Sequence, residues 1–171
     1  IRKWLIAGAI DSNGIKLMST KGTPQGAVIS PLLANIYLHY VLDLWAHNWR
    51  NKHASGDIIF VRYADDGVWG FQREYEAKAF LLHLKERMAK FGLMLHPDKT
   101  RLIRFGRFAE KQRLERGQKK PETFDFLGFT HICSQTRKGD FKLLRLTIKK
   151  KMRVTLKAIR TELHRRRHEP I

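Results

Sequence analysis

The chain has 171 residues, 43% of them apolar, which is enough for one compact domain with a hydrophobic core. Thirty-four basic residues against 16 acidic ones give a net charge of +18, which favours polyanionic partners such as nucleic acid. No apolar run is long enough to span a membrane, and Cys133 is the single cysteine, so an integral membrane protein and a disulfide-bonded secreted domain are both excluded.

The positive charge is unevenly distributed along the chain. Residues 1–100 contain 13 basic and 9 acidic side chains, whereas residues 101–171 contain 21 basic and 7 acidic ones. The field that attracts a polyanion is therefore strongest in the last third, and we expect the main nucleic-acid contact there.

The first part of the chain predicts a turn followed by a helix. The apolar residues 4–10 and the polar run 11–14 are typical of a helix end and a turn. Ser30 and Pro31 form a helix start, with Ser30 as the N-cap, and the helix should run to about Trp49. Its apolar residues recur at helical spacing: Leu33, Ile36, Tyr37, Tyr40 and Leu44.

A hairpin and a second helix follow. Residues 57–63 and 66–71 predict two strands joined by a two-residue turn at Ala64 and Asp65. The next apolar residues predict an amphipathic helix that ends at Gly92 and covers the sheet. They are Ala77, Phe80, Leu81, Leu84, Met88 and Phe91.

The last third predicts short strands and a basic helix. We expect strands at 93–95, 101–105, 124–132 and 141–148, interrupted by a polar, mobile loop at 107–121. From Lys149 onward, four apolar residues fall on one helical stripe among basic neighbours. They are Met152, Leu156, Ile159 and Leu163. This order of elements predicts an α+β domain followed by the start of a helical one.

Asp65 and Asp66 are adjacent carboxylates at the predicted hairpin tip. Two negative charges so close together raise each other's pKa unless a cation neutralises them. Mg²⁺ is held by one or two carboxylates together with substrate phosphates, as phosphoryl transfer requires. The alternative interpretation of the pair alone is a solvated acidic turn.

Four ordered motifs resemble those of one protein family. Residues 58–66 (IIFVRYADD) resemble the Tyr-x-Asp-Asp hairpin of reverse transcriptases. Residues 22–38 (GTPQGAVISPLLANIYL) resemble the segment that precedes this hairpin in group II intron reverse transcriptases. Residues 92–100 (GLMLHPDKT) and 124–129 (FDFLGF) are similar to the next two motifs of that family. Retron enzymes share the aspartate hairpin, but the long form of the 22–38 motif favours group II introns.

The resemblance implies a fold and a domain order. Residues 1–148 would be the C-terminal part of a reverse transcriptase palm, in which an antiparallel sheet packs on helices. Residues 149–171 would begin the helical thumb or maturase region. The sequence begins with Ile1, so we expect a piece of a longer protein.

The resemblance also implies the catalytic and nucleotide-binding residues. Asp65 and Asp66 would be the catalytic carboxylates that bind Mg²⁺, with Mn²⁺ as the alternative cofactor. Contacts to the nucleotide and the template are implied for Pro24, Gln25, Gly26, Tyr63 and Lys99. The chemistry of residues 22–26 agrees with this, because glycine lets the backbone approach a nucleotide closely and Gln25 both donates and accepts hydrogen bonds. The alternative interpretation of these five residues is an ordinary turn before a helix.

The nucleic-acid contacts implied by the resemblance lie further along the chain. Lys99 would stabilise the leaving pyrophosphate, and its alternative interpretation is an exposed loop lysine. The primer grip would be a hairpin that contains Phe126, Leu127, Gly128 and Phe129. Without the resemblance, these residues would be interpreted as part of the hydrophobic core. The nucleic-acid backbone would be contacted by Lys149, Lys150, Lys151 and Arg153.

One element of the family pattern is missing. The first metal-binding aspartate of the family lies on an earlier palm strand, and nothing before Gly22 resembles it. Asp11, Asp43 and Asp57 are poor substitutes, because they fall in a turn, on a helix and at a strand start. The fingers are also absent, so we expect the segment alone to be inactive.

The resulting function is RNA-directed DNA polymerisation by a group II intron protein, by two-metal nucleotidyl transfer. Its partners would be an RNA template, a DNA primer, deoxynucleoside triphosphates and structured intron RNA. The protein would also act as a maturase. We expect it in the bacterial cytoplasm, with no membrane partner. The alternatives are a non-catalytic RNA-binding maturase module and a retron-type enzyme. The oligomeric state is left open.

Overall fold

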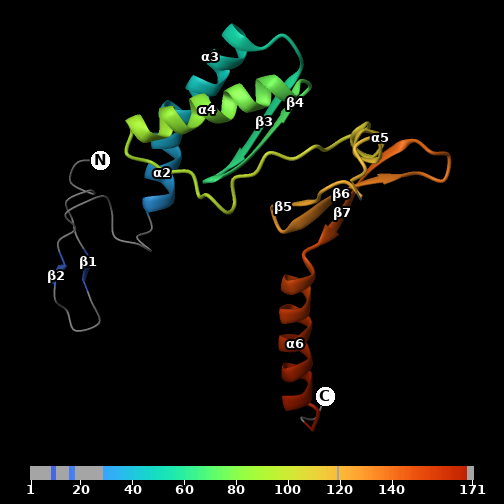
Figure 1. Ribbon diagram of the computed structural model, residues 1–171. Helices are drawn as coiled ribbons and strands as arrows, with labels where there is room; N and C mark the ends of the chain where they lie inside the picture. The colour runs from blue at the N-terminus through green and yellow to red at the C-terminus, as the bar shows by residue number, and fades with distance from the viewer. Residues whose placement is uncertain (1–8, 11–15, 18–28, 119, 169–171) are drawn as a thin grey trace. The chain divides into compact units, whose positions relative to one another are not determined.

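The computed structural model describes residues 9–10, 16–17, 29–118 and 120–168 (Figure 1). The chain divides into two compact units, Ile1–Thr100 and Arg101–Ile171. Each unit combines helices with antiparallel strands, which confirms the α+β class and the palm-type packing of sheet on helix. No helix in the described part of the chain is both long and apolar enough to cross a lipid bilayer.

The first strands form a short antiparallel pair. β1 (Ala9–Ile10) pairs with β2 (Lys16–Leu17), with Ala9 opposite Leu17 and Ile10 opposite Lys16. The predicted turn at 11–14 lies outside the described residues, and Ile10 lies in a strand rather than at a helix end. Residues 4–8 of the predicted helix end lie outside the described residues.

The predicted first helix is one helical rod with a wider turn inside it. It consists of α2 (Ser30–Leu38), the π-helical turn η1 (His39–Asp43) and α3 (Leu44–His53). In η1 the backbone N–H of Leu44 donates to the carbonyl of His39, five residues earlier. The helix starts where predicted, but it ends at His53 rather than at Trp49.

The start of this helix corrects the predicted cap. Ile29 holds the N-cap position, no side chain caps the helix, and Ser30 is the first helical residue. Pro31 lies in the first turn, where a missing backbone N–H removes no helical hydrogen bond. The proline therefore marks the helix start correctly, while the cap lies one residue before the predicted serine.

The buried side of the rod differs from the apolar stripe in the sequence. Of that stripe, Ile36, Tyr37, Tyr40 and Leu44 are exposed. No residue of α2 is buried, so the apolar spacing in that helix predicted a buried face that the structure does not show. The side chains that enter the core are Val41, Leu42, Ala46 and Trp49.

The predicted hairpin and second helix are confirmed. β3 (Ile58–Tyr63) pairs with β4 (Asp66–Phe71), and α4 (Glu74–Lys90) follows. Phe91 is the C-cap of α4, and Gly92 then adopts a left-handed φ of 68°, as expected of a glycine after a helix. Figure 1 shows α3 and α4 running together along the hairpin.

An aromatic cluster fills the core of the first unit. The ring of Phe80, on α4, lies 5.1 Å from that of Trp49, 5.3 Å from that of Phe60 and 5.2 Å from that of Phe71. These contacts join the rod, both strands and α4, so the hairpin is held on its inner face by packed helices.

The second unit contains a three-stranded antiparallel sheet. β5 (Phe124–Phe126), β6 (Phe129–Gln135) and β7 (Phe141–Thr147) are adjacent in chain order, preceded by α5 (Ala109–Leu114) and followed by α6 (Lys149–Arg165). The strand at 141–148 and the helix from Lys149 are confirmed.

Four predictions in this part of the chain are wrong. Residues 93–95 and 101–105 form no strand, because β pairing needs a partner strand that a short apolar run does not specify. The predicted strand at 124–132 is a hairpin instead, since Leu127 and Gly128 turn the chain. The predicted loop at 107–121 contains α5.

Candidate catalytic hairpin and nucleic-acid interface

The tip of the β3–β4 hairpin is a two-residue turn. Tyr63 pairs with Asp66, which leaves Ala64 and Asp65 as the turn. Ala64 has a φ of 53°, which matches the positive φ of the first residue in the primed turns of tight hairpins. This conformation is unusual for alanine, and such backbone strain is concentrated at functional sites.

The two aspartates at this tip are open to solvent. Both are exposed, and neither carboxylate makes a hydrogen bond or an ion pair with another described residue. Asp66 lies on the outer face of the hairpin beside Tyr63, whose exposed fraction is 65%. The outer face is therefore free to meet a ligand, while the inner face is covered by helices.

The donor set at the tip fits a divalent metal ion in part. Asp65 and Asp66 provide carboxylate oxygens, the ligands that Mg²⁺ prefers, with free coordination directions toward solvent. Among the described residues, no group of three His, Cys, Asp or Glu side chains gathers around one point. The pair thus suits an ion that is also held by phosphates or by another carboxylate.

A half-buried arginine lies directly behind the tip and was absent from the predicted site. Arg62 Nε donates to Asp43 Oδ1 at 2.7 Å, and Arg62 Nη2 donates to Asp43 Oδ2 at 2.6 Å. Arg62 Nη1 donates both to Asn35 Oδ1 at 2.9 Å and to the carbonyl of Ala64 at 2.7 Å. One feature of the sequence could have indicated this position of Arg62. In an alternating strand Arg62 falls on the same face as Ile58 and Phe60, which is the inward face of β3.

Asp43 is therefore occupied by an ion pair. Its hydrogen bond with Arg62 lowers the pKa of the Asp43 carboxyl below the ordinary value, against a smaller opposing effect of burial. A carboxylate with both oxygens bound to a guanidinium is not available to a metal ion. This agrees with the expectation that Asp43 is a poor substitute for the family's first metal-binding aspartate. Asp57 is exposed before β3, and Asp11 lies outside the described residues.

The predicted nucleotide-binding residues are placed only in part. Lys99 lies in the turn after α4, where the N–H of Thr100 donates to the carbonyl of His96 at 2.9 Å, and its side chain is exposed. Pro24, Gln25 and Gly26 lie outside the described residues. Their roles remain predictions.

The predicted primer grip is the tip of the β5–β6 hairpin. Leu127 and Gly128 have φ values of 49° and 84°, the two positive values of a type I′ turn. Leu127 is 50% exposed and Phe129 is 45% exposed, while Phe126 is half-buried, so the tip is not simple core.

This tip adjoins the start of the basic helix. The N–H of Ile148 donates to the carbonyl of Gly128 at 3.2 Å, and Phe129 pairs with Thr147 in the sheet. Lys149 then begins α6. Apolar side chains of the turn and the lysines of the helix start thus belong to one continuous region of the second unit.

α6 carries a dense positive charge. The predicted backbone contacts Lys149, Lys150, Lys151 and Arg153 are exposed in its first turns, and no acidic residue lies in the first turn. Glu162 is the single acidic residue of α6 and pairs with Arg165 and Arg166 near the other end. The basic residues at the start are therefore free to contact phosphates.

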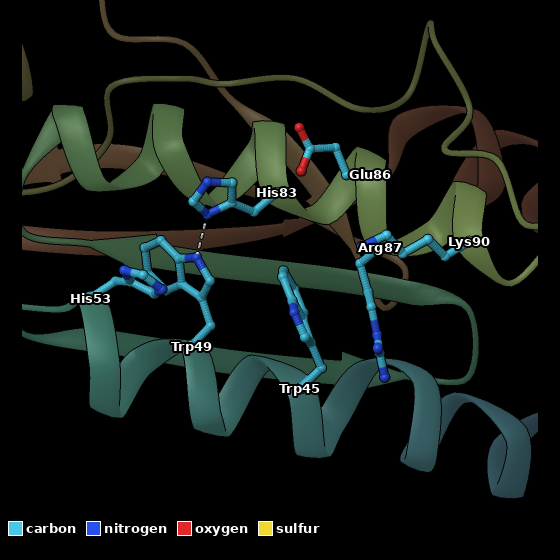
Figure 2. A pocket seen from close by; sticks show the side chains of 7 residues that line it. All are labelled: Trp45, Trp49, His53, His83, Glu86, Arg87 and Lys90. Carbon is cyan, nitrogen blue, oxygen red and sulfur yellow. Dashed lines mark hydrogen bonds between the residues drawn. The ribbon is translucent and has the colours of Figure 1, made fainter.

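The hollow between α3 and α4 is a separate feature (Figure 2). There Trp49 Nε1 donates to His83 Nδ1 at 2.8 Å, across the two helices. None of the predicted site residues lines this hollow. The hydrogen bond satisfies a buried indole N–H, so we assign it to packing.

Comparison with known proteins identifies the class. Residues 1–131 match the family described as reverse transcriptase (RNA-dependent DNA polymerase). This match covers more than half of the chain, so the protein belongs to the reverse transcriptase family. The resemblance indicated by the four motifs is confirmed.

A curated relative comes from a yeast intron. The chain is 48% identical over 154 residues to an uncharacterized 91 kDa protein in cob intron of Schizosaccharomyces pombe (strain 972 / ATCC 24843). The alignment covers 60% of this chain and 19% of the relative. The chain therefore spans about a fifth of the length of that protein.

Proposed function

We propose that this chain is part of an RNA-directed DNA polymerase whose catalytic hairpin is the β3–β4 turn. The observation that carries the proposal is the pair of exposed aspartates at a strained tip, on an outer face that no described helix covers. Membership of the reverse transcriptase family supports it.

In this proposal the two carboxylates hold divalent cations, Mg²⁺ in preference and Mn²⁺ as the alternative. The chemistry that such cations supply is activation of the primer 3′-hydroxyl and neutralisation of triphosphate charge. The 3′ oxygen then forms a bond to the α-phosphorus, and pyrophosphate leaves. Asp65 and Asp66 orient these charges, and Tyr63 lies on the same face as Asp66 to contact the nucleotide.

The other residues of the chain position the substrates. Pro24, Gln25 and Gly26 form the floor beneath the incoming nucleotide and the templating base, and Lys99 stabilises the pyrophosphate. The exposed turn at Leu127 and Gly128 holds the primer end in line. The lysines at the start of α6 grip the RNA–DNA duplex through its phosphates, largely independent of sequence.

We further propose that the whole protein is encoded by a group II intron and also binds intron RNA as a maturase. The form of residues 22–38 supports this assignment, and so does a relative named as a protein in an intron. Residues 1–148 serve as palm and 149–171 as the start of the thumb, in a protein of the bacterial cytoplasm.

Two measurements on the same variant distinguish a polymerase from an RNA-binding module. In an active reverse transcriptase carrying this sequence, Asp65→Asn combined with Asp66→Asn should abolish primer extension on an RNA template while RNA affinity is retained. The change removes two charges and keeps the side-chain size. If extension continued at the parental rate, the catalytic assignment of Asp65 and Asp66 would be wrong.

A further inference from the structure

Arg62 connects three separate parts of the first unit. Its guanidinium uses four of its five N–H donors, two on Asp43 in η1, one on Asn35 in α2 and one on the carbonyl of Ala64 in the turn. The side chain is only 17% exposed, against 34% for Asp43. An arginine held this way has one conformation.

The acceptor at Ala64 belongs to the peptide that leads into Asp65. Because a peptide unit is planar, a hydrogen bond to the Ala64 carbonyl fixes the orientation of the Asp65 N–H as well. Ala64 has a left-handed φ that alanine rarely adopts, so the turn needs an external interaction to remain in this conformation. Arg62 supplies that interaction at 2.7 Å.

We propose that Arg62, anchored by Asp43, is a positioning residue that holds the Ala64–Asp65 peptide so that the two tip carboxylates are preorganised for their cations. This inference rests on the proposed function of the hairpin. It also gives the π turn a role, since η1 carries Asp43 and faces the strand at Arg62. Lysine cannot substitute, because one ammonium cannot span a carboxylate, an amide and a carbonyl together.

The test uses Arg62→Lys in an active, full-length reverse transcriptase that carries this sequence. Arg62→Lys keeps the charge opposite Asp43 and so avoids leaving a half-buried carboxylate unpaired. Arg73→Lys is the matched control, because Arg73 is an exposed arginine beyond the other end of β4. Hydrogen exchange, Mn²⁺ binding and single-turnover nucleotide addition are measured on both variants.

The expected result is local to the hairpin tip. In Arg62→Lys the amides of the turn should exchange faster while those of α4 are unchanged, Mn²⁺ should bind more weakly, and duplex affinity should stay at the parental value. Turnover should fall on the order of tenfold to a hundredfold, since a displacement of about 1 Å at a reacting centre has effects of this size. Arg73→Lys should match the parent in all three measurements.

Two results would overturn the proposal. One is unchanged exchange at the turn with parental turnover, which would mean that Arg62 does not hold the tip. The other is equal loss of protection in the turn and in α4, which would mark a general stabilising role. Failure of the proposed function is distinguishable, because an active Asp65→Asn variant would refute it without altering the exchange result.

Discussion

At the scale of single residues, the proposed catalytic pair could be found from the sequence, whereas the groups that surround it could not. Asp65 and Asp66 stand in a recognisable motif, with the turn placed correctly between two strands. The Arg62 contacts depend on Asn35 and Asp43, which lie 27 and 19 residues away. No local pattern specifies which distant side chains will surround a half-buried guanidinium.

Glu76 is a second buried charge whose environment was not predicted. It is 1% exposed, and its Oε1 accepts from the N–H of Ser55 at 2.7 Å, from the hydroxyl of Ser55 at 2.7 Å and from the N–H of Gly56 at 3.3 Å. The hydrogen bond from the Ser55 N–H is the largest cause that lowers the pKa of Glu76. Glu76 therefore ties the loop before β3 to α4.

This environment predicts a pH-dependent stability. A lowered pKa in the folded state means that the stabilisation by Glu76 is fully present above the ordinary value of 4.5 and is lost as the pH falls through the folded-state value. Glu76→Gln should lower the melting temperature at neutral pH, and the difference from the parent should shrink in acid. Glu86→Gln, at an exposed position of α4, is the control and should show neither effect. A pH-independent difference would contradict this account.

At the scale of elements, the elements with a regular local pattern of apolar residues were predicted. The elements that depend on pairing with a distant strand were not. α4 followed from its apolar spacing, and the β3–β4 hairpin from two β-rich runs around a short turn. The stretches 93–95 and 101–105 look like strands by composition, but strand formation requires a neighbour to pair with. The π turn in the first helix has no local signal in the sequence.

The packing of α4 gives a stability prediction. Phe80 is 2% exposed at the centre of the aromatic cluster, so Phe80→Ala should lower the free energy of unfolding by about 3–5 kcal/mol through reduced burial and a cavity. Leu82→Ala on the same helix, at an exposed position, should change it by less than about 0.5 kcal/mol. Urea unfolding of both variants checks this, and a similar decrease in the two would contradict the described core.

The position of α6 gives a binding prediction. Changing Lys149, Lys150 and Lys151 to Gln should weaken RNA–DNA duplex binding and reduce its salt slope by roughly 0.7–0.9 for each phosphate that the variant no longer neutralises. The physical reason is that fewer counterions are released. The matched control changes Lys111, Lys138 and Lys142 to Gln, which removes the same charge elsewhere in the second unit. Equal slopes in both triple variants would show that net charge alone, rather than the start of α6, governs binding.

At the scale of the whole molecule, motif order identified the family, and the described structure places only part of the site. The family match spans residues 1–131 and includes the 22–38 motif, whose first seven residues lie outside the described residues. The proposed catalytic hairpin belongs to the first unit, and the proposed primer-grip turn and the basic helix belong to the second. Sequence analysis could give the order of these parts but not the spatial contacts within each.

The central claim is that the tip of the β3–β4 hairpin carries the polymerase chemistry. Single-nucleotide addition to a DNA primer on an RNA template tests it most directly, in a full-length reverse transcriptase that carries this sequence. Asp57→Ala is the matched control, because Asp57 is an exposed aspartate beside the opposite end of the same hairpin. We predict that Asp65→Ala abolishes addition while Asp57→Ala retains it, with equal duplex affinity in both. Near-parental addition by Asp65→Ala would contradict the account.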